Sequence, residues 1–215
     1  MEAEVQAICV GQPAPFKDGE LSAIGKRPLD ATAEIRALGI VGDKQADTKH
    51  HGGPDMAVHQ YPLDHYDWWA QRLNGHELLA HQPAFGENLV VAGMTETDIH
   101  IGDRFRLGSA LLEVSQPRQP CWKIEHRFQR KGMVKAIIQN HRCGWYYRVI
   151  EEGEAQAGDT LQRIATGHTD WSVARVFAKL FDPKDKAGTE ELREMASLDQ
   201  LTASWRKNIA EKLGD

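Results

Sequence analysis

The sequence predicts a mainly β fold, a barrel with peripheral helices, followed by a small C-terminal bundle of three helices. Across residues 1–166, short runs of β-branched, aromatic and other apolar residues are separated by turn signals such as Gly-Gln-Pro and Gly-Asp. That pattern is typical of a β-barrel rather than of a parallel sheet with alternating helices. After a polar linker at 167–170 the apolar spacing becomes purely helical. We therefore predict two domains, a barrel over 1–166 and a helical extension over 167–215.

The strands of the barrel are predicted by short apolar runs bounded by glycine or proline. Residues 87–91 follow a Phe-Gly turn, and the strongly alternating run 99–108 is expected to form a hairpin with the next one. The predicted strands are 5–10, 31–40, 87–91, 99–108, 110–114, 145–150 and 160–164.

Helices are predicted over 62–73, where Pro62 suits the first helical position, over 122–128 and over 133–140. In the extension, 173–181 carries an apolar stripe that stops at Asp182-Pro183, and a short helix surrounds Leu192 and Met195. Ser197-Leu198-Asp199-Gln200 has the pattern of a capping box, which predicts the start of the third helix. Its inward face would carry Leu198, Leu201, Trp205, Ile209 and Leu213.

Composition excludes several classes of protein. The 215 residues are 41% hydrophobic, enough for a core, and the net charge of −5 argues against binding to a nucleic acid polymer, which needs a basic face. For the same reason we expect the helical bundle to be a stabilising cap on the barrel rather than a DNA-binding unit. No apolar run approaches the roughly 20 residues that span a bilayer, so no membrane association is expected.

The cysteine pattern indicates a reducing compartment. Cys9, Cys121 and Cys143 are few, odd in number and without a Cys-x-x-Cys pair, and the acidic N-terminus lacks the features of a signal peptide. A cytoplasmic location is expected.

The segment 111–128 is the best candidate for chemistry. A strand is followed by a loop with two prolines, then by Cys121 and a helix, so Cys121 is expected near the first helical position. Free N–H groups at a helix start and the fixed charge of Arg118 both favour a thiolate, the form that attacks electrophiles or binds soft metals. The alternative is that Cys121 is a small buried apolar residue, the usual place of a free cysteine.

Two further stretches suggest a polar pocket. Gly52-Gly53 follows His50-His51 and would let the backbone adopt positive φ close to a ligand. The histidines at 50, 51 and 59 could ligate zinc, but no second cluster has the required spacing, and a solvated histidine pair is the commoner outcome. The functional role that we favour for His51 and His59 is hydrogen bonding in a polar pocket. Lys26, next to Gly25, could hold an anion such as phosphate, although the local sequence favours an ordinary solvated turn.

Standard hydrolase motifs are absent from the sequence. There is no Gly-x-Gly-x-x-Gly, P-loop, Gly-x-Ser-x-Gly or His-Glu-x-x-His. A Cys-His nucleophile remains possible, with Cys121 paired to His51, His59 or His126.

Taken together, several of these stretches resemble the MOSC family, the domain also found at the carboxyl end of molybdenum cofactor sulfurases. The matching pieces span about residues 4–165 and come in the family's order: Gly42-Asp43, His51-Gly52-Gly53-Pro54-Asp55, Phe85-Gly86-Glu87-Asn88-Leu89, Gly102-Asp103-Arg104-Phe105 and Pro117-Arg118-Gln119-Pro120-Cys121. The helical extension is similar to that of the family's 6-N-hydroxylaminopurine resistance branch.

The resemblance implies a barrel of the pyruvate-kinase-barrel-like type that holds a molybdopterin-type molybdenum cofactor. Cys121 would be the protein's ligand to molybdenum, which suits a soft thiolate. Lys26, Arg118 and the backbone at Gly52 and Gly53 would bind the phosphate and pterin of the cofactor. As implied by the resemblance, Asn88, His51 and His59 would donate hydrogen bonds around the metal or substrate.

The implied activity is the reduction of N-hydroxylated compounds, in particular hydroxylaminopurine bases, to their amino forms. His59 or His51 is the expected proton donor, given the ordinary histidine pKa near 6.5. Three cysteines cannot supply a four-cysteine iron–sulfur cluster and no flavin or nicotinamide motif is present, so electrons would come from a separate protein, a flavoprotein reductase. Two alternatives stay open: a carrier of molybdenum cofactor or sulfur without reductase activity, and a cofactor-free cysteine enzyme such as a thiol transferase.

Overall fold

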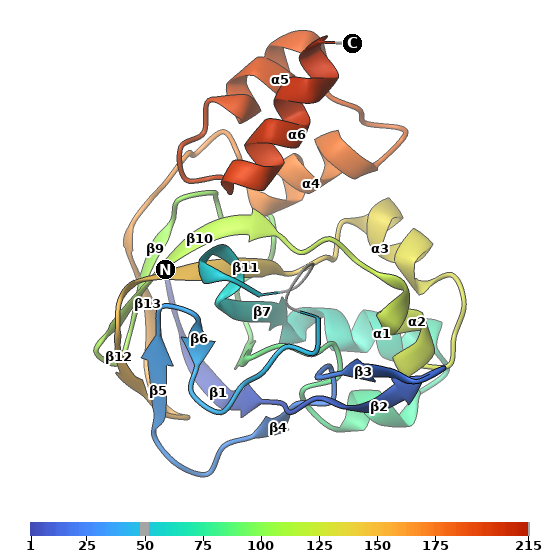
Figure 1. Cartoon of the computed structure of the whole chain (residues 1–215), viewed down its shortest axis with the longest axis vertical. Coiled ribbons are helices and arrows are strands. Elements are labelled where there is room, and N and C mark those ends of the chain that lie inside the picture. Colours follow the sequence, from blue (N-terminus) through green and yellow to red (C-terminus); the bar gives the residue numbers. More distant parts are fainter. Residues whose placement is uncertain (48–51, 215) are drawn as a thin grey trace.

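A computed structural model, which describes residues 1–47 and 52–214, places a closed β-barrel below a cluster of C-terminal helices (Figure 1). Around the barrel the strands follow the order β13-β9-β10-β11-β7-β8-β1, and β1 pairs back onto β13. Neighbours are antiparallel except β7 and β8. The strands are β1 (Glu2–Val10), β7 (Val58–Pro62), β8 (Leu89–Val91), β9 (Arg104–Leu107), β10 (Ala110–Pro117), β11 (Trp145–Glu151) and β13 (Thr160–Ala165).

Strand β10 lies between β9 and β11 and leads directly into the segment that carries Cys121. All eight of its residues are buried, and it pairs with β9 on one side and β11 on the other. The barrel interior is filled by large side chains from successive strands, because side chains alternate across a barrel wall. Fully buried examples are Tyr61, Phe105, Leu112, Val114, Trp145, Tyr147 and Leu161.

Smaller strands and helices surround the barrel. The pieces β5 (Ala33–Arg36), β6 (Gly39–Ile40) and β12 (Gly153–Ala155) form a side sheet, β4 (Arg27–Pro28) pairs with β1, and β2 (Ala14–Lys17) with β3 (Glu20–Ser22) forms a hairpin. That hairpin lies beside α2 (Figure 1). The helices beside the barrel are α1 (Tyr66–Arg72), α2 (Trp122–Arg127) and α3 (Met133–Asn140), with 3-10 turns η1 (Pro54–Met56), η2 (Leu63–His65) and η3 (Glu77–Ala80).

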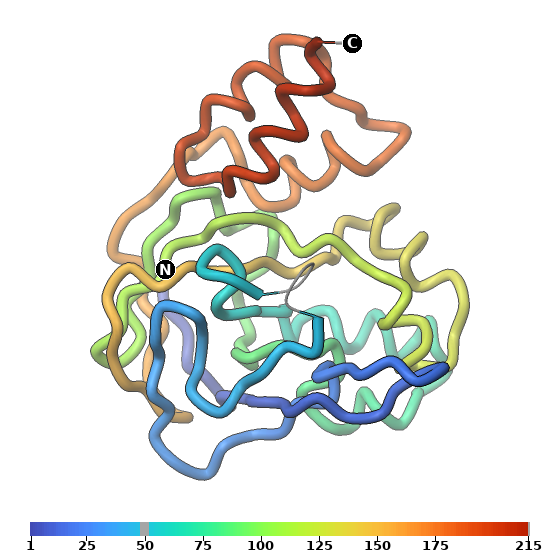
Figure 2. The backbone as a smooth tube through the Cα atoms, in the orientation of Figure 1, coloured from blue at the N-terminus to red at the C-terminus, as the bar shows by residue number. Residues whose placement is uncertain are grey.

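The C-terminal extension consists of α4 (Val173–Phe181), α5 (Thr189–Ala196) and α6 (Ala203–Gly214). After β13 the chain climbs one side of the barrel and then forms the three helices at its end (Figure 2). The predicted inward residues Leu198, Leu201, Trp205 and Ile209 are buried, whereas Leu213 is half-buried. Within the described residues no helix is long and apolar enough to cross a membrane.

Three predicted elements differ from the structure. Residues 31–40 form a hairpin rather than one strand, because the chain turns at 37–38 and Gly39, with φ 125°, begins the return strand β6. The run 99–108 contributes only β9, since 99–103 forms a turn. Pro62 ends β7, and the helix expected from 62 begins as η2 and becomes α1 at Tyr66.

The capping box predicted at Ser197 is also wrong. Ser197 ends α5, and its hydroxyl donates to the carbonyl of Glu194 at 2.7 Å. The Gln200 side chain instead lies 2.6 Å from His168 Nε2, and the third helix starts at Ala203. The residues 197–202 are used to connect α5 to α6 and to contact the barrel.

Candidate functional site

Cys121 lies at the end of the loop that leaves β10. Its extended backbone, φ −127° and ψ 168°, makes it the residue just before the first turn of α2, as the sequence predicts. The loop is anchored where the N–H of Arg118 donates to the carbonyl of Gly144 at 2.9 Å. Cys121 is half-buried and lines a cavity, unlike the fully buried Cys9 and Cys143. The alternative of a sealed apolar cysteine therefore does not hold.

The cavity beside Cys121 has about 650 Å³ of empty space, including its opening to solvent, and a cationic lining. Lys26, Lys44, Arg118 and Lys123 all face it, together with a single carboxylate in the described lining, that of Asp47. Histidine and aromatic side chains complete the wall, from His59, Phe85 and Tyr146. A cavity lined in this way favours an anionic ligand.

Arg118 brings a buried positive charge to this cavity. The residue is 7% exposed, and its Nη1 has no hydrogen-bond partner among the described residues. A guanidinium cannot lose its charge, and an unpaired buried charge is unfavourable. An anion in the cavity would provide the missing acceptor.

His59 is held as a neutral imidazole. Its Nδ1 lies 3.2 Å from the carbonyl oxygen of Gly86, so Nδ1 carries the proton and Nε2 has a free lone pair. Burial lowers the pKa of His59 well below 6.5, and the charges of Arg118 and Lys26 lower it further. The expected pKa near 6.5 is therefore wrong. Nε2 is buried without a partner in the described part of the chain, and the ring lies 5.0 Å from that of Tyr146.

Asn88 lies behind the cavity wall and has its side chain fully engaged. Its amide nitrogen donates to the carbonyl of Cys9 at 3.0 Å and to Asp43 at 2.9 Å, and its Oδ1 accepts from the N–H of His59 at 3.0 Å. Lys26 pairs with the same carboxylate of Asp43, which also accepts from the N–H of Gly11 at 2.7 Å. Asn88 and Asp43 thus position His59 and Lys26 rather than facing a ligand themselves.

The two glycines predicted for the site have the expected backbone conformation but do not lie in the cavity wall. Gly52 and Gly53 adopt φ 96° and 87°, as the sequence predicts, yet neither lines the cavity. A side chain at Gly52 would meet Gln45, which does line it, so the glycine lets that wall approach. His51, and with it His50, lies outside the described residues.

His126 does not pair with Cys121. Its Nε2 lies 3.0 Å from the carbonyl oxygen of Phe16 in the β2–β3 hairpin, and its ring packs 4.6 Å from that of Phe16. Among the described residues no hydrogen bond joins Cys121 to a histidine. No described histidine therefore acts as the base of a Cys-His nucleophile in this structure.

Glu87, in the segment 85–89, closes a turn. Its carboxylate accepts from the N–H of Phe85 at 2.9 Å and from the hydroxyl of Tyr66. Burial raises the pKa of Glu87. Gly86, with φ 81°, thereby presents its carbonyl to His59.

Three residues that line the cavity were not predicted from the sequence as site residues: Lys44, Lys123 and Tyr146. Burial raises the pKa of Tyr146, against the opposite effect of Arg118, so its hydroxyl stays protonated and can donate. Lys123 follows Cys121 by two residues and could have been found from that spacing. Lys44 and Tyr146 reach the cavity only through folding.

These residues fit a molybdopterin-type cofactor. A half-buried thiol is a suitable soft ligand for molybdenum. The unpaired Nη1 of Arg118 and the nearby lysines suit the anionic phosphate and pterin portions of the cofactor. Within the described residues, no cluster of three or more histidine, cysteine or acidic side chains is placed to hold a metal ion.

Comparison with known families gives two matches along the chain. Residues 47–162 match the MOSC domain, and residues 171–213 match the YiiM-like 3-alpha helix domain. Solved structures are also similar: YiiM from Geobacillus stearothermophilus superimposes with a TM-score of 0.82 at 30% identity, covering 98% of this chain and 99% of that one.

Curated relatives align over most of the chain. An uncharacterised Bacillus subtilis protein, YflK, is 38% identical over 97% of this chain and 93% of its own length. YiiM of Escherichia coli is 33% identical over 95% of this chain and 90% of its length. A much longer Gibberella moniliformis protein named "Reductase" is 40% identical over 74% of this chain but only 28% of its own length. The chain therefore belongs to the MOSC domain family and, with its three-helix extension, to the YiiM branch of that family.

Proposed function

We propose that the chain is a reductase of N-hydroxylated compounds that depends on a molybdopterin-type molybdenum cofactor. Its proposed substrates are base analogues of the 6-N-hydroxylaminopurine type, which it would convert to the amino forms and so detoxify. The observation that carries the proposal is a half-buried thiol, Cys121, in a cationic cavity that it shares with the buried Arg118, whose Nη1 has no hydrogen-bond partner among the described residues. The similarity to a protein named reductase supports the reaction class.

The chain's own residues would divide the work of binding. Cys121 would ligate molybdenum, and Arg118, Lys26, Lys44 and Lys123 would hold the anionic parts of the cofactor. When bound, the cofactor would supply the two electrons that the reaction needs. The overall change is R–NHOH plus two protons and two electrons to R–NH₂ plus water.

Two neutral side chains in the wall of the cationic cavity, His59 and Tyr146, would make the hydrogen bonds to the substrate or to water. His59 is neutral, so its Nε2 would accept a hydrogen bond and orient a ligand or water rather than act as an acid. The protonated hydroxyl of Tyr146 lines the same cavity and could donate to the N–O oxygen. The electrons would come from a separate flavoprotein reductase.

A turnover assay tests this function. The full chain is purified from cells that make molybdenum cofactor and is given a chemical reductant and 6-N-hydroxylaminopurine. We expect stoichiometric formation of adenine, and loss of turnover in Cys121→Ser. Cofactor-loaded protein that forms no adenine would instead favour the carrier of molybdenum cofactor or sulfur. Turnover in protein without molybdenum would favour a cofactor-free cysteine enzyme.

A further inference from the structure

A second cavity opens on the other side of Cys121, between the barrel and helix α6. It has about 1410 Å³ of open space. It shares part of its lining with the cationic cavity: Asp47, Gln119, Cys121, Lys123 and Tyr146. Cys121 therefore lines both cavities and lies where they meet.

The two cavities differ in chemistry. The second has one cationic side chain in its described lining, Lys123, beside the acidic residues Glu20 and Asp47. The rest of its wall is neutral. Apart from the apolar Met56 and Pro120 it is mostly aromatic or capable of hydrogen bonding, with Ser204, Trp205 and Asn208 from α6 and Gln116, Tyr146 and Trp122 from the barrel side. Such a wall suits a neutral, planar, nitrogen-rich ring better than an anion.

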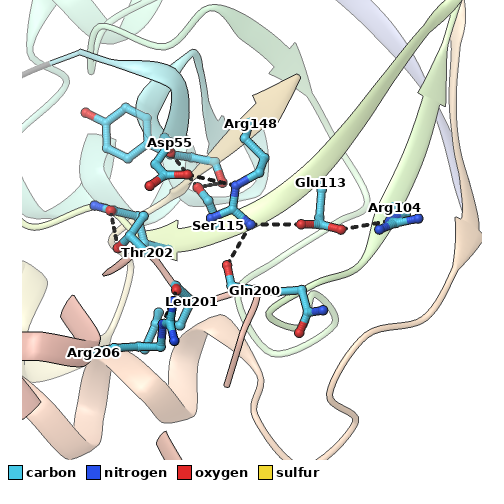
Figure 3. Close-up of polar contacts among 11 residues, drawn as sticks. Asp55, Arg104, Glu113, Ser115, Arg148, Gln200, Leu201, Thr202 and Arg206 are labelled. Atoms are coloured by element: carbon cyan, nitrogen blue, oxygen red, sulfur yellow. Dashed lines mark hydrogen bonds and ion pairs between the residues drawn. The ribbon is translucent and has the colours of Figure 1, made fainter. Parts of the chain in front are cut away.

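Polar contacts join the loop before α6 to the barrel beside this cavity (Figure 3). The Thr202 hydroxyl donates to Oε1 of Gln116 at 2.8 Å, and the Thr202 N–H donates to the carbonyl of Ser115 at 3.2 Å. Arg148 Nη1 donates to the carbonyl of Gln200 at 2.8 Å. These bonds fix the start of α6 next to β10 and hence next to the Cys121 loop.

Two carboxamides remain available to a ligand. Within the described residues the Gln116 side chain makes one hydrogen bond, the one from Thr202, which leaves its N–H groups unused. The exposed Asn208 side chain makes none there. A carboxamide offers a donor and an acceptor side by side, the arrangement that pairs with the edge of an adenine ring.

Trp122 adds a surface for stacking. One part of its indole packs against Phe16, with ring centres 6.0 Å apart, and lies under Lys17 Nζ at 5.6 Å. The residue is still 42% exposed, unusual for a large aromatic side chain. Aromatic side chains bind base rings by stacking.

We propose that this second cavity binds the purine ring of the substrate, an assignment that rests on the proposed function. Asn208 and Gln116 pair with its ring nitrogens, Trp122 stacks on it, and the exocyclic N–O group points to Cys121. The C-terminal extension is then the specificity element of the enzyme.

Binding of adenine to the full chain, measured by isothermal titration without reductant, tests this assignment independently of turnover. We expect wild type to bind adenine and Asn208→Ala and Trp122→Ala each to bind it about tenfold more weakly, the loss of one good contact. Lys207→Ala is the matched control, because Lys207 is its neighbour on α6 but 78% exposed and outside the cavity. Wild-type protein that does not bind adenine, or variants that bind it equally well, would overturn the proposal.

Kinetics on molybdenum-loaded protein separates this proposal from the proposed function. Asn208→Ala should raise KM for 6-N-hydroxylaminopurine about tenfold with little change in kcat, a larger rise than for N-hydroxyurea, which has no ring, whereas Lys207→Ala should leave the kinetics of both compounds as in wild type. An equal loss with both substrates would refute a ring-binding role. If wild type reduces neither compound, the proposed function is wrong, and the adenine titration still decides the cavity assignment.

Discussion

Among single residues, His59 and Arg118 define the electrostatics of the site together. Both are buried, and each has one side-chain nitrogen without a partner in the described residues, Nε2 and Nη1 respectively. The guanidinium keeps its charge, so it helps to hold the imidazole neutral. The result is one fixed cation and one neutral acceptor facing the same cavity.

The depressed pKa of His59 predicts a specific dependence of stability on pH. The unfolded chain binds a proton at this histidine below about pH 6.5, whereas the folded chain does not, so the free energy of unfolding falls as pH falls. Between pH 6.5 and 5 this one group should remove about 2 kcal/mol. Urea denaturation of wild type and His59→Gln across this range should show the extra loss in wild type alone. Parallel curves for the two proteins would contradict the assignment.

Part of the site could be predicted from local sequence. Cys121 and Arg118 lie in one short segment after a strand, where the helix start and the fixed charge both point to chemistry. The contacts of Lys26 and Asn88 with Asp43 could not be predicted, because they join residues 17 and 45 positions apart. The sequence also assigns His59 an ordinary pKa, since burial and the neighbouring cations arise only on folding.

At the level of elements, Asn88 connects three strands of the barrel. It directly precedes β8, and its side chain bonds to the backbone of β1 at Cys9 and of β7 at His59, and to Asp43 in the turn after β6. Each of these strands borders the cavity or supports its wall. The carboxamide of Asn88 therefore adds side-chain bonds to the backbone pairing that holds these strands together.

We predict that Asn88→Ala lowers the free energy of unfolding by about 3 kcal/mol, because it leaves the Cys9 carbonyl and the His59 N–H buried without partners. Equilibrium urea denaturation measures this change. Asn208→Ala is the control, since that exposed side chain bonds to no described residue, and it should stay within about 0.5 kcal/mol of wild type. Equal stability of the two variants would show that Asn88 does not hold the strands together.

Elements were predictable where apolar periodicity decides the structure. The strands at 110–114 and 145–150 and the helix at 173–181 occur where expected, although β10 and β11 extend beyond the predicted runs. Prediction failed where a turn depends on a distant contact. Gly39 begins the return strand after the turn at 37–38, where an added Cβ would lie 2.6 Å from the carbonyl oxygen of Ala57. Ser197 has the local pattern of a helix start but is used to end α5.

Across the whole molecule, the barrel and the extension are joined by a network around Arg148 (Figure 3). Its guanidinium donates to Asp55, to Glu113 and to the carbonyl of Gln200, each at 2.8 Å. Glu113 is buried, and its carboxylate also pairs with Nε of Arg104 at 2.7 Å. One side chain therefore connects η1, β10 and the loop before α6.

Arg148→Met should lower the free energy of unfolding by about 3 kcal/mol, because Glu113 stays buried after losing one of its two cationic partners. Amide hydrogen exchange in α6 should become faster, since the bond to Gln200 is lost. Arg106→Met is the control: it removes an exposed pair with Glu151 and should cost less than about 1 kcal/mol. Unchanged exchange in α6 would mean that other contacts fix the extension.

The molybdenum content of the purified full chain tests the central claim most directly. Protein from cells that make molybdenum cofactor should carry about one molybdenum per chain through the Cys121 thiolate. Cys121→Ser should lose the metal, while Cys143→Ala, which removes a buried thiol outside both cavities, should keep it. Wild-type protein without molybdenum, or Cys121→Ser with as much as wild type, would contradict the assignment of Cys121 as the metal ligand.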